Sequence, residues 1–275
     1  MRVLITNDDG IDAPGIRWLA RAVVREGHDV LVAAPLEEAS GSSAAMSAVE
    51  QDGKIVVQRR ELAGARDVPA YAVAASPAFI VLLAMREAFG AAPDMVMSGI
   101  NRGANAGAAV LHSGTVGATL TASHAGLHGL AVSLDVLTLA TASAASGGAE
   151  IDEQEDEQRH WGSAADLAVR LLPTLTQTPA GTVLNLNVPD LHADGIRGLR
   201  RARLARFGQV QISIAEAGEG FVRTVVQAAD EGLEPGTDLA ALAESYAVVT
   251  PIRAPGEARD VRLQLETIHV QPPAM

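Results

Sequence analysis

The chain has 275 residues, and its net charge of -12, from 33 acids and 21 bases, argues against a protein that grips a nucleic-acid duplex through a basic face. It contains no cysteine, which excludes disulfide bonds, thiolate metal sites and cysteine nucleophiles. Hydrophobic residues make up 48% and aromatic residues 3%, so we expect a sizeable core of Ala, Val, Leu and Ile. No apolar run is long enough to span a bilayer, and Asp8 and Asp9 interrupt any signal-peptide pattern, so we expect a soluble cytoplasmic protein without a membrane partner.

The first predicted elements form a strand–helix–strand unit. Residues 2–6 and 29–34 are short apolar runs typical of buried strands. Asp12 or Ala13 can cap the helix between them, and Pro14 suits its first turn. The apolar residues of this helix recur at helical spacing, at Ile16, Leu19, Ala20 and Val23.

The same alternation of helices and apolar strands continues along the chain. It predicts a helix opening at Ser76-Pro77, a strand over 94–100, a helix over 115–127, a strand over 130–134, a helix over 161–172 and a strand over 182–188. Uninterrupted apolar strands alternating with helices are typical of a parallel sheet covered on both faces. We therefore expect an α/β fold, a Rossmann-like three-layer sandwich with a mostly parallel sheet.

Two segments depart from this pattern within what we expect to be a single domain over 1–275. Residues 141–160 are small and polar, then strongly acidic, which is typical of a flexible, solvated loop. We therefore expect the acidic stretch over 149–157 to be dispensable. After a core over 1–200, the runs VQISI and FVRTVVQA predict antiparallel strands, so residues 201–275 are expected to form a β-rich extension for oligomerisation.

Polar residues follow three of the predicted strands, at 7–10 (NDDG), 40–43 (SGSS) and 98–105 (SGINRGAN). The carboxyl ends of parallel strands share one edge of a sheet, so these loops are expected to converge. Successive strand residues point to opposite faces, so Asp8 and Asp9 can share an ion only if the chain bends, which Gly10 eases. Carboxylate, hydroxyl and amide oxygens suit Mg²⁺ or Mn²⁺. The alternative is that the two acids form only a helix-capping turn.

A candidate anion site lies at residues 113–115, where Ser-Gly-Thr leads from a loop into a helix. Free backbone N–H groups and the helix dipole favour a phosphate at such a position. The chain lacks a dinucleotide-binding G-x-G-x-x-G after its first strand, a P-loop and a G-x-S-x-G elbow.

Several stretches of the sequence, in the order in which they occur along the chain, make it resemble the SurE family of metal-dependent phosphatases, the 5′/3′-nucleotidases also called stationary-phase survival proteins. The resemblance covers most of the chain. The motifs are ITNDDGIDAPGI near the start, AAPLEEASGSS after the second predicted strand, SPA at 76–78, SGINRGANAG followed by HSGTVGA, LNLNVPD at 184–190 and GTDLAALAESYAVVTPI at 236–252.

The resemblance implies a Rossmann-like core, a homodimer or homotetramer, and one divalent ion, Mg²⁺ or Mn²⁺, per subunit. It places the metal ligands at Asp8, Asp9, Ser40 and Asn101, and the phosphate-binding region at Asn105, Ser113, Gly114 and Thr115. We expect further substrate contacts from neighbouring residues of the same loops, Asn7, Gly41 and Ser42.

The implied reaction is hydrolysis of a nucleoside monophosphate to nucleoside and phosphate by a 5′-nucleotidase. In the implied reaction the metal would polarise the phosphoryl oxygens and activate a water, whose proton one of the two catalytic aspartates, Asp8 or Asp9, would take. Asp9 is the favoured candidate, and the sequence leaves both open.

The chain also departs from the family pattern around these positions. Alanines stand at 44, 45, 108 and 109, where the family usually has polar or acidic residues, and His112 replaces a tyrosine. All four expected metal ligands are present. Two alternatives therefore stay open beside the nucleotidase: a phosphatase for another small phosphomonoester, and a non-catalytic protein that binds a nucleotide or phosphate.

Overall fold

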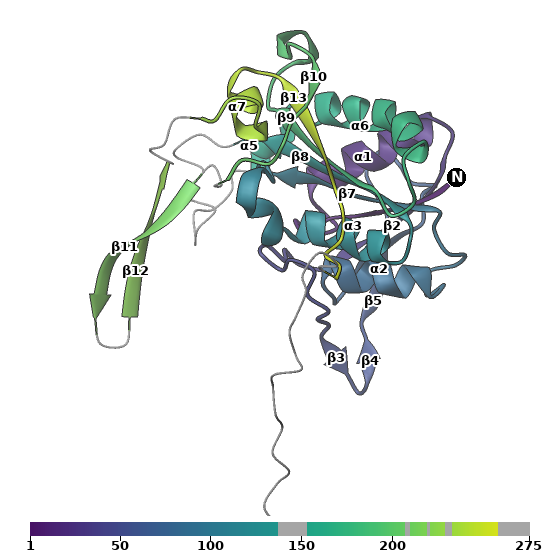
Figure 1. The fold of residues 1–275 in the computed structure, drawn as a ribbon. Coiled ribbons are helices and arrows are strands. Elements are labelled where there is room, and N and C mark those ends of the chain that lie inside the picture. Colours follow the sequence, from purple (N-terminus) through teal and green to yellow (C-terminus); the bar gives the residue numbers. More distant parts are fainter. Residues whose placement is uncertain (137–152, 207–209, 219–220, 229–232, 258–275) are drawn as a thin grey trace, which may run out of the picture.

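The computed structural model describes residues 1–136, 153–206, 210–218, 221–228 and 233–257. A nine-stranded sheet crosses the domain (Figure 1). Its six central strands are parallel neighbours, in the order β6 (Ala70–Val73), β2 (Asp29–Pro35), β1 (Arg2–Thr6), β7 (Met95–Arg102), β8 (His128–Asp135) and β9 (Val183–Pro189). Antiparallel strands flank them: β5 (Val57–Arg60) beside β6, and β13 (Ala247–Ile252) beside β9, with β10 (Leu199–Arg201) parallel to β13 at the edge.

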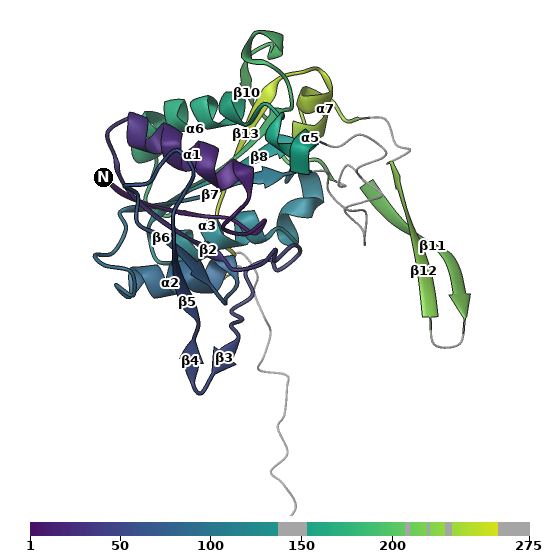
Figure 2. The same ribbon diagram turned by 180° about the vertical axis from the view of Figure 1, so that it is seen from behind.

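Helices cover both faces of this sheet, as Figure 2 shows from behind. On one face α1 (Pro14–Arg25) and α6 (Trp161–Thr176) pack over side chains such as Val3 and Ile5. On the other face α2 (Pro77–Met85) and α3 (Gly114–His124) pack over side chains such as Leu4. The two faces follow from the alternation of side chains along each strand. The predicted three-layer sandwich with a mostly parallel sheet is confirmed.

The short elements lie around this frame. They are β3 (Glu50–Gln51), β4 (Lys54–Ile55), η1 (Gly107–Leu111), α5 (Glu153–Glu157), η2 (Ala193–Gly195), β11 (Val210–Gly218), β12 (Phe221–Ala228) and α7 (Asp238–Ala243). Within the described residues, no helix is long and apolar enough to cross a membrane.

The helix starts follow local sequence. Ala13, not Asp12, is the N-cap of α1, and no side chain bonds to that cap; Pro14 fills the first helical position, which needs no N–H donor. Ser113 is the N-cap of α3, and its hydroxyl accepts a hydrogen bond from the Val116 backbone N–H at 3.0 Å.

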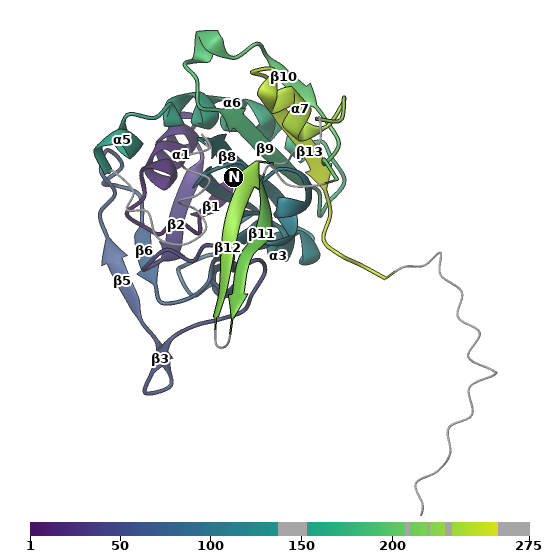
Figure 3. The same ribbon diagram turned by 90° about the vertical axis from the view of Figure 1, so that its left-hand side faces the viewer.

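Residues beyond position 200 contribute to the main sheet as well as to a separate hairpin. Strand β13 lies between β9 and β10, and its neighbour α7 packs Leu239 and Leu242 against Val248. The antiparallel pair β11–β12 forms its own two-stranded sheet and projects from the body of the domain (Figure 1). Figure 3 is viewed from the side of this hairpin, which therefore lies in front of the body. The boundary expected at residue 200 therefore does not mark the end of the main sheet, because β10 crosses it and β13 lies beyond it.

The expectation of a flexible, solvated loop over 141–160 is wrong at residues 153–157, which form a helix that buries Asp156, although residues 154, 155, 157 and 158 are exposed as expected. Residues 153–157 form α5 and α6 begins at Trp161, while the residues before 153 lie outside the described part. Asp156, in the middle of the acidic run, is only 3% exposed. The composition of the acidic run could not indicate this burial, because it depends on hydrogen bonds from Arg102 and Arg159 to Asp156. The burial of Asp156 counts against the expectation that the stretch over 149–157 is dispensable, which stays a prediction for a deletion variant to test.

Candidate functional site

The expected convergence of loops occurs at the carboxyl end of β1. Asp8 follows this strand and is buried, and the Thr115 hydroxyl, from the first turn of α3, donates to its Oδ1. The same hydroxyl lies 3.2 Å from Oδ1 of Asn101, which belongs to β7. A carboxylate and an amide oxygen from two different strands thus meet at one hydroxyl group.

The chain bends sharply after Asp8, as sharing an ion between neighbouring acids requires. Gly10 takes a φ of +96°, which glycine adopts without strain, and the Asn7 side chain donates to its carbonyl at 2.8 Å. Asp9 therefore faces β7, where its Oδ2 accepts the Arg102 backbone N–H at 3.2 Å. Its Oδ1 lies 3.9 Å from the Arg102 guanidinium, and its side chain is 6% exposed.

The second loop meets Asp8 through the backbone of Ala39 and brings the Ser42 side chain to the same glycine of α3. The Ala39 N–H donates to the Asp8 carbonyl at 2.7 Å, which ties the loop to β1. A Cβ added at Gly114 would lie 2.5 Å from the Ser42 Oγ and 2.8 Å from the Asp8 Oδ2, so both oxygens flank this glycine. The Ser42 Oγ is buried and has no hydrogen-bond partner among the described residues.

The other expected contacts of this loop point elsewhere. Ser40 is exposed, and its hydroxyl donates to the Glu38 carboxylate. Gly41 is also exposed, with a φ of +74° and no atom within 4 Å of an added Cβ. Ser43 donates to the Leu111 carbonyl at 2.8 Å, which holds the loop against the approach to α3.

Asn105 is buried and ties its loop to the neighbouring strands. Its backbone N–H donates to the Asn187 side chain at 2.7 Å, its carbonyl accepts from Asn185 at 2.7 Å, and its own amide donates to Ser133 at 2.9 Å. Ser113 is likewise buried, with its hydroxyl engaged as the cap of α3. The structure therefore groups Asp8, Thr115, Gly114, Ser42 and Asn101 closely, with Asp9 beside Arg102.

The pKa of each aspartate is raised above its usual value in the protein without a bound cation. Burial raises the pKa of Asp8, although hydrogen bonds from the Thr115 hydroxyl and from the backbone of Thr115 and Gly114 oppose the change. Burial, and then the charge of Asp8, raise the pKa of Asp9 to about 7, against the lowering effect of Arg102. The cluster is therefore short of positive charge.

This donor set fits a hard divalent cation. No group of three or more His, Asp or Glu side chains able to hold a metal occurs in the described part of the chain, so amide or hydroxyl oxygens have to complete the shell. Asn101 supplies an amide oxygen beside Asp8, and Ser42 supplies a buried hydroxyl without a partner. Oxygen ligands of this kind are those that Mg²⁺ and Mn²⁺ prefer.

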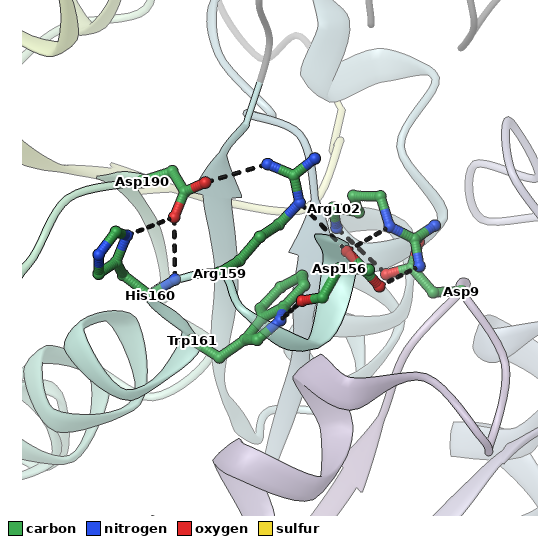
Figure 4. Close-up of polar contacts among 7 residues, drawn as sticks. All are labelled: Asp9, Arg102, Asp156, Arg159, His160, Trp161 and Asp190. Carbon is green, nitrogen blue, oxygen red and sulfur yellow. Dashed lines mark hydrogen bonds and ion pairs between the residues drawn. The ribbon is translucent and has the colours of Figure 1, made fainter. Parts of the chain in front are cut away.

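A pocket of about 780 Å³ opens over Asp9. Its walls come from the start of α1, from Glu38, from Arg102 and from α5 with the residue after it. Sequence reasoning missed two of its residues. Arg102 is part of the motif SGINRGANAG, but sequence reasoning assigns it no role and treats Asp156 only as part of the acidic run. Figure 4 shows both side chains beside Asp9. A second pocket of about 630 Å³ is lined by Ser40 and Ser42 but by neither aspartate, so the first pocket is the one that opens onto Asp9, and Asp8 lines neither.

Comparisons with known proteins agree with this geometry. The family model described as Survival protein SurE matches residues 3–211. A 5′-nucleotidase SurE of Xanthomonas campestris pv. campestris is 35% identical over 258 residues, covering 92% of this chain and 89% of that protein. One of Aeromonas hydrophila subsp. hydrophila is 34% identical over 257 residues, with 92% of each chain covered.

The same likeness holds in three dimensions. A crystal structure of the SurE protein from Aquifex aeolicus aligns with a TM-score of 0.73 at 25% identity, covering 94% of this chain and 96% of that one. With the family model spanning most of the chain and relatives alike over nearly its whole length, this protein belongs to the SurE family.

Proposed function

We propose that this protein is a divalent-metal-dependent phosphomonoesterase that hydrolyses nucleoside monophosphates to nucleoside and phosphate. The observation that carries the proposal is the meeting of Asp8, Thr115 and Asn101 at the start of α3, beside Asp9. Its relatives in Xanthomonas and Aeromonas bear the name 5′-nucleotidase, which supports this substrate class.

The residues proposed to hold one Mg²⁺ or Mn²⁺ are Asp8, Asp9 and Asn101, with a serine hydroxyl from the second loop. Ser40 is the serine that the family resemblance favours, whereas Ser42 is the one whose unpartnered hydroxyl flanks Gly114 with Asp8. When bound, such an ion polarises phosphoryl oxygens and lowers the pKa of a coordinated water.

The start of α3 is the proposed seat of the phosphate. Its backbone N–H groups at Gly114 and Thr115 already point toward the Asp8 carboxylate, so they can serve a second anion placed beside it. A Cβ at Gly114 would clash with the Ser42 Oγ at 2.5 Å and the Asp8 Oδ2 at 2.8 Å, so glycine is what lets the start of α3 approach the carboxylate this closely. In this proposal Ser113 shapes the turn as the helix cap, and Asn105 holds the preceding loop in place.

Asp9 is better placed than Asp8 to take a proton from the attacking water. Asp9 lines the open pocket, whereas Asp8 is held from several sides by the start of α3. In the reaction the water oxygen bonds to phosphorus, the bond from phosphorus to the nucleoside oxygen breaks, and that oxygen gains a proton.

The purified protein should release phosphate from nucleoside monophosphates with Mn²⁺ or Mg²⁺ and lose this activity with EDTA. A panel of nucleotides, sugar phosphates and p-nitrophenyl phosphate, assayed by released phosphate, checks this. Faster hydrolysis of another phosphomonoester would mean that the protein is a metal-dependent phosphatase with a different substrate. No hydrolysis of any compound, together with measurable nucleotide binding, would instead favour a non-catalytic binding protein.

The substitutions Asp8→Asn and Asp9→Asn each keep the side-chain shape and remove a charge. Both should weaken Mn²⁺ binding and lower the hydrolysis rate by at least about 100-fold. The melting temperature without metal should stay equal or rise, because one buried acid no longer repels its neighbour. Asp29→Asn, at the opposite end of the sheet and 69% exposed, is the matched control. Full activity in both site variants would refute the metal site in favour of a capping turn, since Asn caps as well as Asp.

The metal-free protein should be less stable at pH 8 than at pH 5. The pKa of Asp9 is about 7 in the folded protein and roughly 3.9 when unfolded, so the folded state binds more protons between these values. The stability that this proton gives is full below the unfolded pKa and is lost as the pH rises through 7. Thermal melts in EDTA at both pH values test this, with Asp9→Asn as the comparison. An equal decrease in that variant would mean that other groups cause the effect.

We also propose that the protein is a homodimer or homotetramer and that it works in the cytoplasm, since a chain without cysteine needs no oxidising compartment. The projecting β11–β12 hairpin supports assembly, because an isolated two-stranded sheet is marginally stable alone. Light scattering at micromolar concentration should give at least twice the chain mass of 28.4 kDa. A monomer that persists at higher concentrations would count against the proposal.

A further inference from the structure

Helix α5 and the residue after it form the outer wall of the pocket over Asp9. Gln154, Asp156, Glu157 and Gln158 line this pocket together with Asp9 and Arg102. The wall is therefore made by the acidic run whose composition indicates a solvated loop. Because it stands opposite the proposed metal ligand, the anchoring of α5 bears on the reaction.

One buried side chain anchors this wall. Asp156 accepts two hydrogen bonds from Arg102, from Nε at 3.0 Å and from Nη2 at 2.8 Å, and one from the Arg159 Nε at 3.2 Å. Its carbonyl accepts the indole N–H of the buried Trp161 at 2.7 Å. A carboxylate that is 3% exposed is tolerable only when paired in this way.

The network extends from the wall to the end of β9. Arg159 also reaches Asp190 Oδ2 at 3.0 Å, and Asp190 Oδ1 accepts the backbone N–H of His160 and lies beside its Nδ1, each at 2.9 Å (Figure 4). At the same end of α5, Arg17 of α1 pairs with Glu157, the last residue of the helix. The wall is thus seated on α1, β7 and the residue after β9.

The hydrogen bonds from Arg102 to Asp156 also determine how the Arg102 side chain lies relative to Asp9. Its fork is engaged in two charge-assisted bonds to Asp156, so it faces Asp9 only at 3.9 Å. Burial alone would lower the pKa of Arg102, but the hydrogen bonds and charge of Asp156 and the charge of Asp9 raise it. Arg102 therefore brings positive charge near Asp9 without occupying its oxygens with a two-pronged ion pair.

We propose that Asp156 is a positioning residue for the reaction: it holds Arg102 away from a closed ion pair with Asp9, and it seats α5 as a wall of the pocket through which the substrate reaches Asp9. This rests on the proposed function. Without Asp156, the freed guanidinium would turn to Asp9 and compete with a cation for the carboxylate.

The test uses the full-length protein with the substitution Asp156→Asn. Calorimetric titration with Mn²⁺ should show affinity weakened by about 10-fold or more, in the range found when groups that orient metal ligands are changed. The kcat should fall with it, and the KM for nucleoside monophosphates should rise. Amide hydrogen exchange across 153–160 should speed up. Asp166→Asn, which removes one partner of the exposed Arg25–Asp166 pair at 2.5 Å, should change none of these.

Two further variants keep the proposal open to refutation. If Asp156→Asn does not fold, the double variant Arg102→Gln with Asp156→Asn leaves no lone buried charge from this pair. With no guanidinium left to compete for Asp9, it should bind Mn²⁺ at least as tightly as the wild type while amide exchange across 153–160 is still faster; weakened Mn²⁺ binding in this variant would contradict the proposed competition. Glu157→Gln, at a side chain 56% exposed, should speed amide exchange in α5 and raise KM while leaving Mn²⁺ affinity unchanged.

Unchanged Mn²⁺ affinity, kcat and KM in a folded Asp156→Asn variant would overturn the proposal and leave Asp156 a purely structural residue. Unchanged exchange across 153–160 would overturn the seating of α5. Failure of the proposed function gives a different result, because the wild-type protein would then neither bind Mn²⁺ nor release phosphate, while the exchange experiment would still report on α5.

Discussion

Two adjacent carboxylates at the end of a buried strand impose the constraint on which the rest of the site depends. Asp8 and Asp9 follow β1, and neither has the solvent that normally stabilises its charge. A turn at Gly10 directs the side chains of Asp8 and Asp9 to different neighbours. Asp8 meets the start of α3, and Asp9 meets Arg102 at the end of β7. These contacts offset the loss of solvent around each carboxylate only in part, because the pKa values of both aspartates are still raised.

Much of this arrangement could be predicted from local sequence, since it depends on features that operate within a few residues. Apolar spacing identified α1, the central strands and the start of α3. The common edge of a parallel sheet then brought residues 7–10 and 98–105 together without further information. Gly10 identified the bend, because one residue with a positive φ turns the chain where a straight strand would separate Asp8 from Asp9.

The features that could not be predicted depend on partners far apart in the chain. Nothing local indicates that Asp156 is buried, because its carboxylate is stabilised by Arg102, 54 residues away. Likewise, β13 adds to the sheet beside β9 only because its register matches a strand some sixty residues earlier. Ser40 and Ser42 are both small and polar, and only the packing of Gly114 against their loop distinguishes them. These are tertiary effects, for which composition and periodicity carry no signal.

The charged side chains that line the pocket belong both to the aspartate site and to the network around Asp156. Its walls carry five carboxylates, from Asp9, Asp12, Glu38, Asp156 and Glu157, against two arginines, Arg17 and Arg102. Asp156 and Glu157 are paired with those same arginines, so the positive charge is already engaged in holding the wall. A phosphate group entering such a pocket meets a negative field in a chain whose net charge is already -12.

Under the proposed function, the dipole at the start of α3 is too small to offset this field alone, since it corresponds to about half a unit charge. A cation held by the two aspartates is therefore an electrostatic requirement for phosphate binding as well as for chemistry. The arginines do not remove that requirement, because Asp156 keeps Arg102 at a distance from Asp9 instead of letting it neutralise the carboxylate. Arg102 thus joins the wall to the proposed metal ligands, since it is bound by Asp156 and faces Asp9, and the excess of carboxylates around it is what a bound cation would offset.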